Sequence, residues 1–384
     1  EMREEQYRSI CEACDRALLA PDATLERVAI PWLHVIREHP FTLAQYHDVI
    51  HPSKSLGAWI QRFAQSLWSK GRWGYQMLKA IRSKGNLWFG DDLPEKIDVL
   101  IVSHLLNTSQ AGEEDDFYFG GLPRELANQG QSVLIALIDH TAKPDPELAK
   151  QWKEDAIPRV ILSRTLDLGM EKSFRDRMKR EARRLRKLSE TETDLLRRRV
   201  LKRAAAEALF GGAQGNLRMA QQLSTLVGKL QPKAILVTYE GYALERITFS
   251  AARSAQPMVT CLGYQHSVIF PLQHAIRRNL AKEYNPDQIL TAGSISKAQL
   301  EIAPDLTHTV ISVLGSNRGA EASASASTSE ERLTHQRKSC LVLPEGIKSE
   351  CYLLFEFSLA CARACPDLTF IWHLHPLFSF SMLA

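Results

Sequence analysis

The sequence predicts an α/β protein with two parallel-sheet domains behind a helical N-terminal region. Three observations support this prediction. From residue 96 onward, short apolar runs alternate with helix-compatible stretches, which is the pattern of a parallel sheet with right-handed crossovers. An Ala/Ser-rich stretch then precedes a second, shorter series of the same kind. The first 95 residues instead show helical periodicity with many aromatic side chains.

Composition excludes several classes of protein. The 384 residues have a formal net charge of +4, which does not indicate a nucleic-acid binder, and no apolar run reaches the roughly 18 residues of a transmembrane helix. Seven scattered cysteines, two of them in the apolar runs at Cys261 and Cys340, favour reduced, buried thiols in a cytoplasmic protein. Packing is favoured over zinc for both closely spaced pairs, Cys11 with Cys14 and Cys361 with Cys365.

The helical region covers residues 1–95. Ile60, Phe63, Ala64 and Leu67 recur at the spacing of one helix face, which predicts a buried helix. Basic residues flank the aromatic side chains of this region, as in helices that lie in a membrane interface. Membrane docking therefore remains open as the alternative.

The first sheet domain spans residues 96–319. We expect its strands at 97–104, 132–139, 156–163, 233–238, 257–262, 288–292 and 309–314, and its helices at 118–129, 242–254 and 296–302. A strongly basic helical insertion occupies 171–210. This segment reads as a solvated helix, with contact between 171–203 and anionic lipid as the alternative; the absence of aromatic interleaving argues against nucleic acid.

A linker at 320–338 precedes the start of the second sheet domain, residues 339–384. There we expect a strand at 340–343, a helix at 350–365 and a strand at 368–374, which is one βαβ unit. A single unit cannot bury both faces of a parallel sheet. Since the first residue is also Glu rather than Met, we expect the chain to be part of a longer protein.

Functional residues are expected where strands end, because ligands bind at the carboxyl edge of open parallel sheets. Glu240 follows one predicted strand, and His266 lies in the Gly263–Ser267 loop after the next. A carboxylate facing a histidine is the geometry of a general base and its partner, so these two are the catalytic candidates. Gly293 and Ser294 start a helix after a later strand, where backbone N–H groups suit a phosphate.

The second domain shows similar features. Glu345, Gly346 and Ser349 lie between its first strand and its helix, where a turn and a helix N-terminus can bind anions. His375 ends the next strand, and Pro376 restricts the backbone beside it. This placement predicts a histidine held toward a ligand, with a structural histidine as the alternative.

Two α/β domains joined by a linker resemble the GT-B architecture of nucleotide-sugar glycosyltransferases. Four segments, 118–123, 240–246, 263–267 and 373–376, look like those of bacterial surface-carbohydrate (capsule and lipopolysaccharide) biosynthesis proteins, and the resemblance runs from about Asp98 to the end. It implies contact with the donor's phosphate or nucleotide at His375 and in the Glu345–Gly346 loop, and Pro376, Ser349, Gly293 and Ser294 complete the donor-side candidates. It implies an acceptor side at Gly120, Gly121, Tyr264, Gln265, Glu245 and Arg246.

The resemblance implies transfer of a sugar from a nucleotide-sugar donor to a glycan or lipid-linked acceptor. No Asp-x-Asp pair sits at a strand end, so we expect no metal ion, and no cofactor is implied. We expect a cytoplasmic protein held at the inner membrane through residues 171–203, without a nucleic-acid partner. The alternatives are a non-catalytic GT-B scaffold and a polyol-phosphate transferase.

Overall fold

The computed structural model describes residues 2–35, 43–51, 71, 73–83, 85–141, 143–152, 157–316, 338–344, 347–374 and 380–383. The chain divides into two compact units, Glu1–Arg318 and Gly319–Ala384, which are described separately. The predicted helix face at Ile60, Phe63, Ala64 and Leu67 lies outside the described residues.

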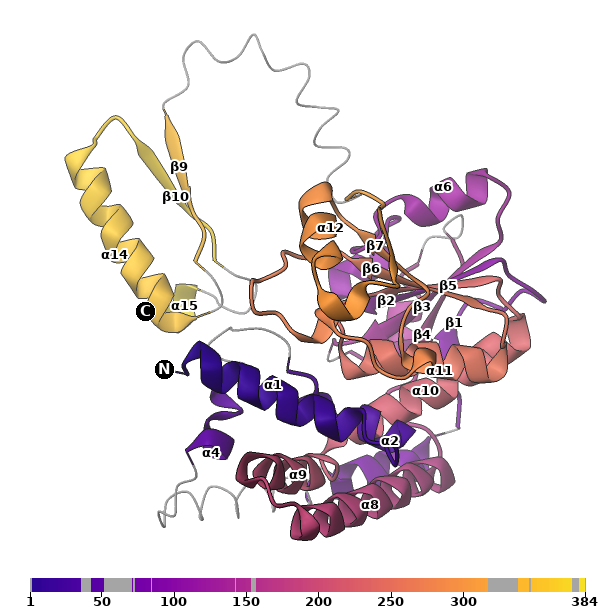
Figure 1. Cartoon of the computed structure of the whole chain (residues 1–384). Coiled ribbons are helices and arrows are strands. Elements are labelled where there is room, and N and C mark those ends of the chain that lie inside the picture. The colour runs from indigo at the N-terminus through magenta and orange to yellow at the C-terminus, as the bar shows by residue number, and fades with distance from the viewer. Residues whose placement is uncertain are drawn as a thin grey trace. The chain divides into compact units, whose positions relative to one another are not determined.

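The first unit contains an eight-stranded sheet in the order β1-β4-β3-β2-β5-β6-β7-β8 (Figure 1). Every neighbouring pair is parallel except β1 and β4. The strands are β1 (Trp88–Gly90), β2 (Val99–Leu105), β3 (Val133–Asp139), β4 (Arg159–Leu162), β5 (Ala234–Thr238), β6 (Thr260–Gln265), β7 (Gln288–Thr291) and β8 (Val310–Val313). The predicted α/β class with a large parallel sheet is confirmed.

The strand order reverses between β2 and β5. The chain first adds β3 and β4 on one side of β2, then crosses back and adds β5 to β8 on the other. This crossing consists of α8 (Leu168–Thr191), α9 (Leu195–Glu207) and α10 (Gly211–Leu230). The carboxyl ends of β2 and β5 therefore form the topological switch point, the position where open α/β sheets bind ligands.

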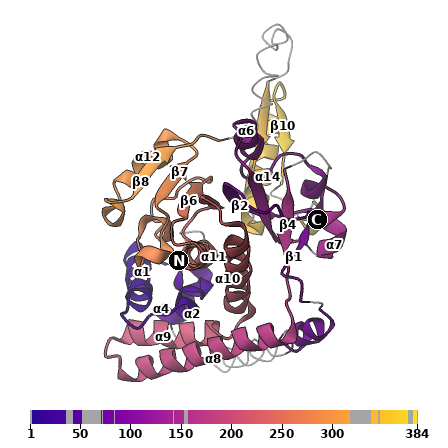
Figure 2. The ribbon, with the colours of Figure 1, turned by 90° about the vertical axis from the view of Figure 1, so that its right-hand side faces the viewer.

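Helices cover both faces of this sheet, as a parallel sheet requires. Leu100 and Val102 of β2 belong to a core shared with α1 (Glu4–Leu18) and α8 to α11, whereas Ile101 belongs to a second core with Phe119 and Leu148. Figures 1 and 2 show α8 and α9 side by side, with α1 and α10 between this pair and the sheet. The remaining helices are α2 (Leu25–Val28), α4 (His47–Ile50), α6 (Leu122–Asn128), α7 (Asp145–Ala149), α11 (Ala243–Ala255) and α12 (Ser294–Glu301), with 3₁₀ turns at η1 (Pro31–Leu33), η2 (Thr108–Gly112), η3 (Ala275–Arg277), η4 (Lys282–Tyr284) and η5 (Pro304–Leu306).

Two predicted boundaries near the strand ends are wrong. The helix expected from Tyr118 begins at Leu122, because Asp116 and Gly120 exchange backbone hydrogen bonds and close a turn first. Strand β6 runs on to Gln265, so part of the predicted Gly263–Ser267 loop is strand. Strand β1 was not predicted from the sequence. It is only three residues long and is defined by its pairing with β4.

The second unit contains a parallel pair, β9 (Ser339–Val342) and β10 (Thr369–Trp372), with α14 (Lys348–Ala364) and α15 (Phe380–Leu383). Val342, Cys351 and Phe355 form its small core. All seven cysteines are free, but the prediction of a buried Cys340 is wrong: in β9 only Val342 is buried among the described residues. No helix in the described ranges is long and apolar enough to span a membrane.

Candidate functional site

Three neighbouring strands bring polar side chains together at the switch point. His104 lies near the end of β2, Thr238 ends β5, and His140 directly follows β3. The His104 ring nitrogens lie 2.9 Å from His140 Nε2 and 3.1 Å from Thr238 Oγ1. The two imidazoles and the hydroxyl therefore form one continuous hydrogen-bonded chain across the edge of the sheet.

These imidazoles are neutral near pH 7. Burial, followed by the neighbouring His140 and His266, lowers the pKa of His104 to about 3. Burial also lowers the pKa of His140. A neutral imidazole offers one donor and one acceptor, so the chain can donate a hydrogen bond at one end while it accepts one at the other.

The end of β6 adds an aromatic contact to this cluster. The His266 ring packs edge-on against Tyr118 with a centroid separation of 4.5 Å, and the His104 ring lies 5.6 Å from the same tyrosine. The Asp116 carboxylate accepts hydrogen bonds from the Tyr118 N–H at 2.8 Å and from the Ser103 hydroxyl at 2.9 Å. Asp116 thereby ties the turn that carries Tyr118 to strand β2.

The acidic group of the site is Glu240, which is 6% exposed and lies two residues beyond β5. Ser267 Oγ donates a hydrogen bond to its carboxylate, which connects the ends of β5 and β6. The Glu245 carboxylate accepts from the backbone N–H groups of Glu240 at 2.9 Å and Tyr242 at 2.8 Å. Burial raises the pKa of Glu245 well above its ordinary value. The predicted catalytic pair, Glu240 and His266, thus comes from adjacent strand ends and is linked through Ser267.

A close backbone contact sets the position of the Glu240 loop. Gly241 has φ +85°, and a Cβ atom there would lie 2.3 Å from the backbone of Ala275. The buried Arg246 guanidinium donates to the carbonyl oxygens of Ala275 at 2.7 Å and Arg278 at 2.8 Å, and to Asn285 Oδ1 at 2.8 Å. Because their hydrogen bonds are made within the protein, we assign Glu245 and Arg246 to positioning this loop.

The other predicted acceptor-side residues lie at the end of β6 and in the turn before α6. Tyr264 is buried and donates to the Gly315 carbonyl at 3.0 Å. The Gln265 amide nitrogen donates to the Ser267 carbonyl, and its Oε1 is buried without a donor among the described residues. Gly120 and Gly121 belong to the turn that carries Tyr118. These residues surround His266 and Tyr118.

Of the predicted donor-side residues, two can be located relative to this cluster. Gly293 and Ser294 start α12 after β7, two strands away from β5. Ser349 is exposed on α14 of the second unit. The remaining four, Glu345, Gly346, His375 and Pro376, lie outside the described residues.

Sequence reasoning missed His104, His140 and Thr238. A signal for them existed, because each lies at or beside the carboxyl end of a strand that the sequence did predict. No group of three His, Cys, Asp or Glu side chains in the described part of the chain is arranged to hold a metal ion.

No family model and no curated protein matches the chain. Among solved structures it is similar to the UDP-N-acetylglucosamine 2-epimerase of Rickettsia bellii, with TM-score 0.40 and 11% identity over 73% of this chain and 62% of that one. It is also similar to the UDP-GlcNAc 2-epimerase of Neisseria meningitidis bound to UDP-GlcNAc, with TM-score 0.35 and 13% identity over 73% and 66% of the two chains. The chain thus spans less than two thirds of either chain. At such low identity, function has to be argued from the residues of this chain.

Proposed function

We propose that the protein is a metal-independent glycosyltransferase of bacterial surface-polysaccharide synthesis, which transfers a sugar from a nucleotide-sugar donor to a glycan or lipid-linked acceptor. The observation that supports this most is the placement of Glu240. Its carboxylate accepts a hydrogen bond from Ser267 and lies two residues beyond β5, whose last residue, Thr238, is hydrogen-bonded to His104. This carboxyl edge of the sheet is the ligand-binding edge of open parallel sheets.

In the proposed reaction, Glu240 accepts the proton of the acceptor hydroxyl. The hydroxyl oxygen forms a bond to the anomeric carbon, while the bond from that carbon to the donor's phosphate oxygen breaks and the leaving phosphate takes the electron pair. General-base assistance of this kind typically contributes about 10²–10⁴-fold in rate. In this proposal, His266 and the His104–His140 pair donate hydrogen bonds to the reacting groups.

The hydrogen bonds also distinguish residues that would contact substrate from residues that position the Glu240 loop. Arg246 and Glu245 hold the Glu240 loop and make their contacts within the protein. His375 would contact the donor phosphate by resemblance alone. Substitution of Glu240 should therefore affect transfer far more than it affects folding or donor binding.

The first test is thermal stabilisation of the protein by UDP, CMP, GDP and CDP. A ligand present at about 100 times its dissociation constant adds about 2.7 kcal/mol to the free energy of unfolding. One clearly preferred nucleotide identifies the donor class. Stabilisation by cytidine nucleotides, with consumption of a CDP-linked polyol and release of CMP, would instead identify a polyol-phosphate transferase.

The second test compares transfer from the identified donor by the wild type, Glu240→Gln and the control Glu147→Gln, whose side chain is exposed on α7. The amide of Glu240→Gln can still accept the Ser267 hydrogen bond but cannot take a proton. We expect loss of at least about 100-fold in kcat with nucleotide binding retained. Stabilisation by none of the nucleotides, together with normal polysaccharide in a Glu240→Gln strain, would support a non-catalytic scaffold.

A further inference from the structure

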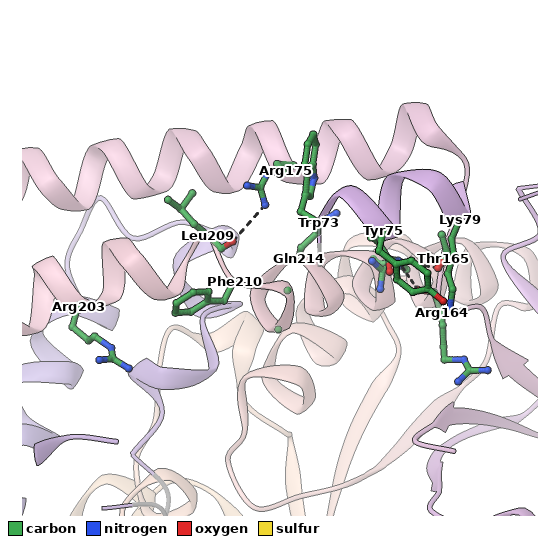
Figure 3. A pocket seen from close by; sticks show the side chains of 14 residues that line it. Trp73, Tyr75, Lys79, Arg164, Thr165, Arg175, Arg203, Leu209, Phe210 and Gln214 are labelled. Carbon is green, nitrogen blue, oxygen red and sulfur yellow. Dashed lines mark hydrogen bonds between the residues drawn. The ribbon is translucent and has the colours of Figure 1, made fainter. Parts of the chain in front are cut away.

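The first unit contains a pocket of about 530 Å³ away from the switch-point cluster, between residues 73–79, α8 and the start of α10 (Figure 3). None of the cluster residues lines it. Arg164 and Thr165, just beyond the end of β4, form part of its wall. Among the described residues, five basic side chains and no acidic one line the pocket: Lys79, Arg164, Arg175, Arg203 and Arg218.

Three of these cations are neutralised by carboxylates of the protein. The partners are Asp145 for Arg164 at 3.0 Å, Glu207 for Arg203 at 2.7 Å and Glu171 for Arg218 at 2.5 Å. Arg175 and Lys79 have no carboxylate within ion-pair distance in the part of the chain that the structure describes. The positive charge of these two side chains is therefore not balanced by an ion pair among the described residues.

Of the two cations without a carboxylate partner, Arg175 has the better-defined surroundings. Its guanidinium lies 4.6 Å from the centroid of the Trp73 ring, as Figure 3 illustrates, and its closest acceptor is the Leu209 carbonyl at 3.5 Å. Burial lowers the pKa of Arg175, and the nearby Asp176 carboxylate offsets only part of this effect, so the cation is partly desolvated. Such a charge is unfavourable unless an anion offsets it.

Uncharged hydrogen-bond donors in the pocket wall also favour an anionic ligand. The 20-residue helix α10 begins at Gly211 in the pocket wall, and its N-cap residue Phe210 makes no side-chain capping bond. The first N–H groups of such a helix and its dipole favour an anion. Trp73 Nε1 is buried with no acceptor among the described residues. A phosphate group offers several acceptor oxygens to donors of this kind.

We propose that this pocket binds the phosphate group of a phosphate ester, with Arg175 and Lys79 supplying the charge and the start of α10 supplying backbone donors. The volume lies within the usual range of small-molecule sites, about 300–1,000 Å³, and exceeds the size of a phosphate ion. Tyr75 and Phe210 line the remaining space and would contact the organic part of the ester. This site does not depend on the proposed transferase activity.

The ester can be a soluble metabolite or a lipid headgroup. Tyr75, Leu78 and Ile81, on the same helical stretch as Lys79, are exposed by 60%, 59% and 63%. Apolar side chains beside a cation suit a membrane surface. The shared chemistry is a phosphate monoester or diphosphate, and the experiment has to distinguish the two sources.

The first arm measures binding of inorganic pyrophosphate by calorimetry. The double variant Arg175→Gln/Lys79→Gln is compared with Arg183→Gln, which removes an exposed cation of the same helix outside the pocket. We expect the double variant to bind about tenfold or more weakly and the control to bind like the wild type. Lys79→Gln alone, at an exposed position, repeats the test without disturbing the packing of Arg175. Equal affinities in all of these proteins, or no binding to the wild type, would overturn the proposal.

The second arm measures co-flotation with vesicles of phosphatidylcholine with and without phosphatidic acid. Flotation only with phosphatidic acid, lost in the double variant and competed by pyrophosphate, assigns a lipid source. Pyrophosphate binding without flotation assigns a soluble ester. Nucleotide stabilisation and transfer that persist in the double variant would separate this pocket from the switch-point site, so either proposal can fail alone.

Discussion

Substitution of Gly241 by alanine tests whether the Glu240 loop is held where the structure places it. An added Cβ would lie 2.3 Å from both the carbonyl carbon and oxygen of Ala275 in η3. These are backbone atoms, so no flexible side chain can move aside. Gly130 provides a matched control, because it has a similar φ of +81° and an added Cβ there would meet no atom within 4 Å.

Both variants place a non-glycine residue in the left-handed region, but only Gly241→Ala also introduces a steric clash. A non-glycine residue in the left-handed region costs about 1–2 kcal/mol, which both variants bear. Forcing an extra methyl group into a packed contact adds about 1–3 kcal/mol, which only Gly241→Ala bears. We therefore expect losses of about 1–2 kcal/mol for Gly130→Ala and about 2–5 kcal/mol for Gly241→Ala.

Urea denaturation followed by circular dichroism measures both losses, provided that the slope of unfolding free energy against urea is unchanged. Gly241→Ala should also reduce sugar transfer, because relief of the clash displaces the Glu240 loop. Equal losses of stability in the two variants would refute the close approach between the Gly241 and Ala275 backbones. Greater loss in Gly130→Ala would refute it too.

Two further predictions concern titration and thiol chemistry. Burial acts to raise the pKa of Asp15, but Arg278 and His274 bind the carboxylate and hold that pKa below 3.8. The ionised Asp15 therefore stabilises the folded protein above about pH 4, and this contribution is lost as pH falls through the folded-state pKa. Asp15→Asn should cost about 3 kcal/mol at pH 7, as measured by urea denaturation, and should flatten the acid limb of the stability profile; an unchanged acid limb would contradict this. Burial raises the pKa of the Cys261 thiol to about 12, whereas Cys340 is exposed, so an aromatic disulfide reagent should modify Cys340 and spare Cys261 in the native protein. A smaller fast phase in Cys340→Ser, with the remainder due to the exposed Cys365, would support this, and one common rate for all seven cysteines would contradict it.

Several features of the fold were predictable because they depend on near neighbours in sequence. The apolar runs at 97–104 and 132–139 became β2 and β3 almost residue for residue, since buried strands need continuous apolar residues. The turn at Asp116 was not predicted. Its carboxylate accepts hydrogen bonds from the backbone N–H groups two and three residues later. These bonds compete with helix formation, so α6 begins only at Leu122.

The pairing of strands lay beyond sequence reasoning. Three-residue β1 has no periodicity of its own to detect and exists through its antiparallel contact with β4. The reversal of strand order likewise depends on where α8 to α10 return the chain. Without that order, nothing in the sequence connects His104 with Thr238, which are 134 residues apart but in hydrogen-bond contact.

The sequence by itself determined the α/β class, the positions of most strands and the prediction that Glu240 and His266 follow consecutive strands. These properties follow from apolar periodicity and turn residues, which act over a few positions. Only the tertiary structure decided that β2 and β5 are neighbours, that Arg246 turns inward to hold a loop, and that Arg175 faces a pocket without a carboxylate partner among the described residues. Such features depend on which distant segments pack together, and that choice is made by burial of the whole core.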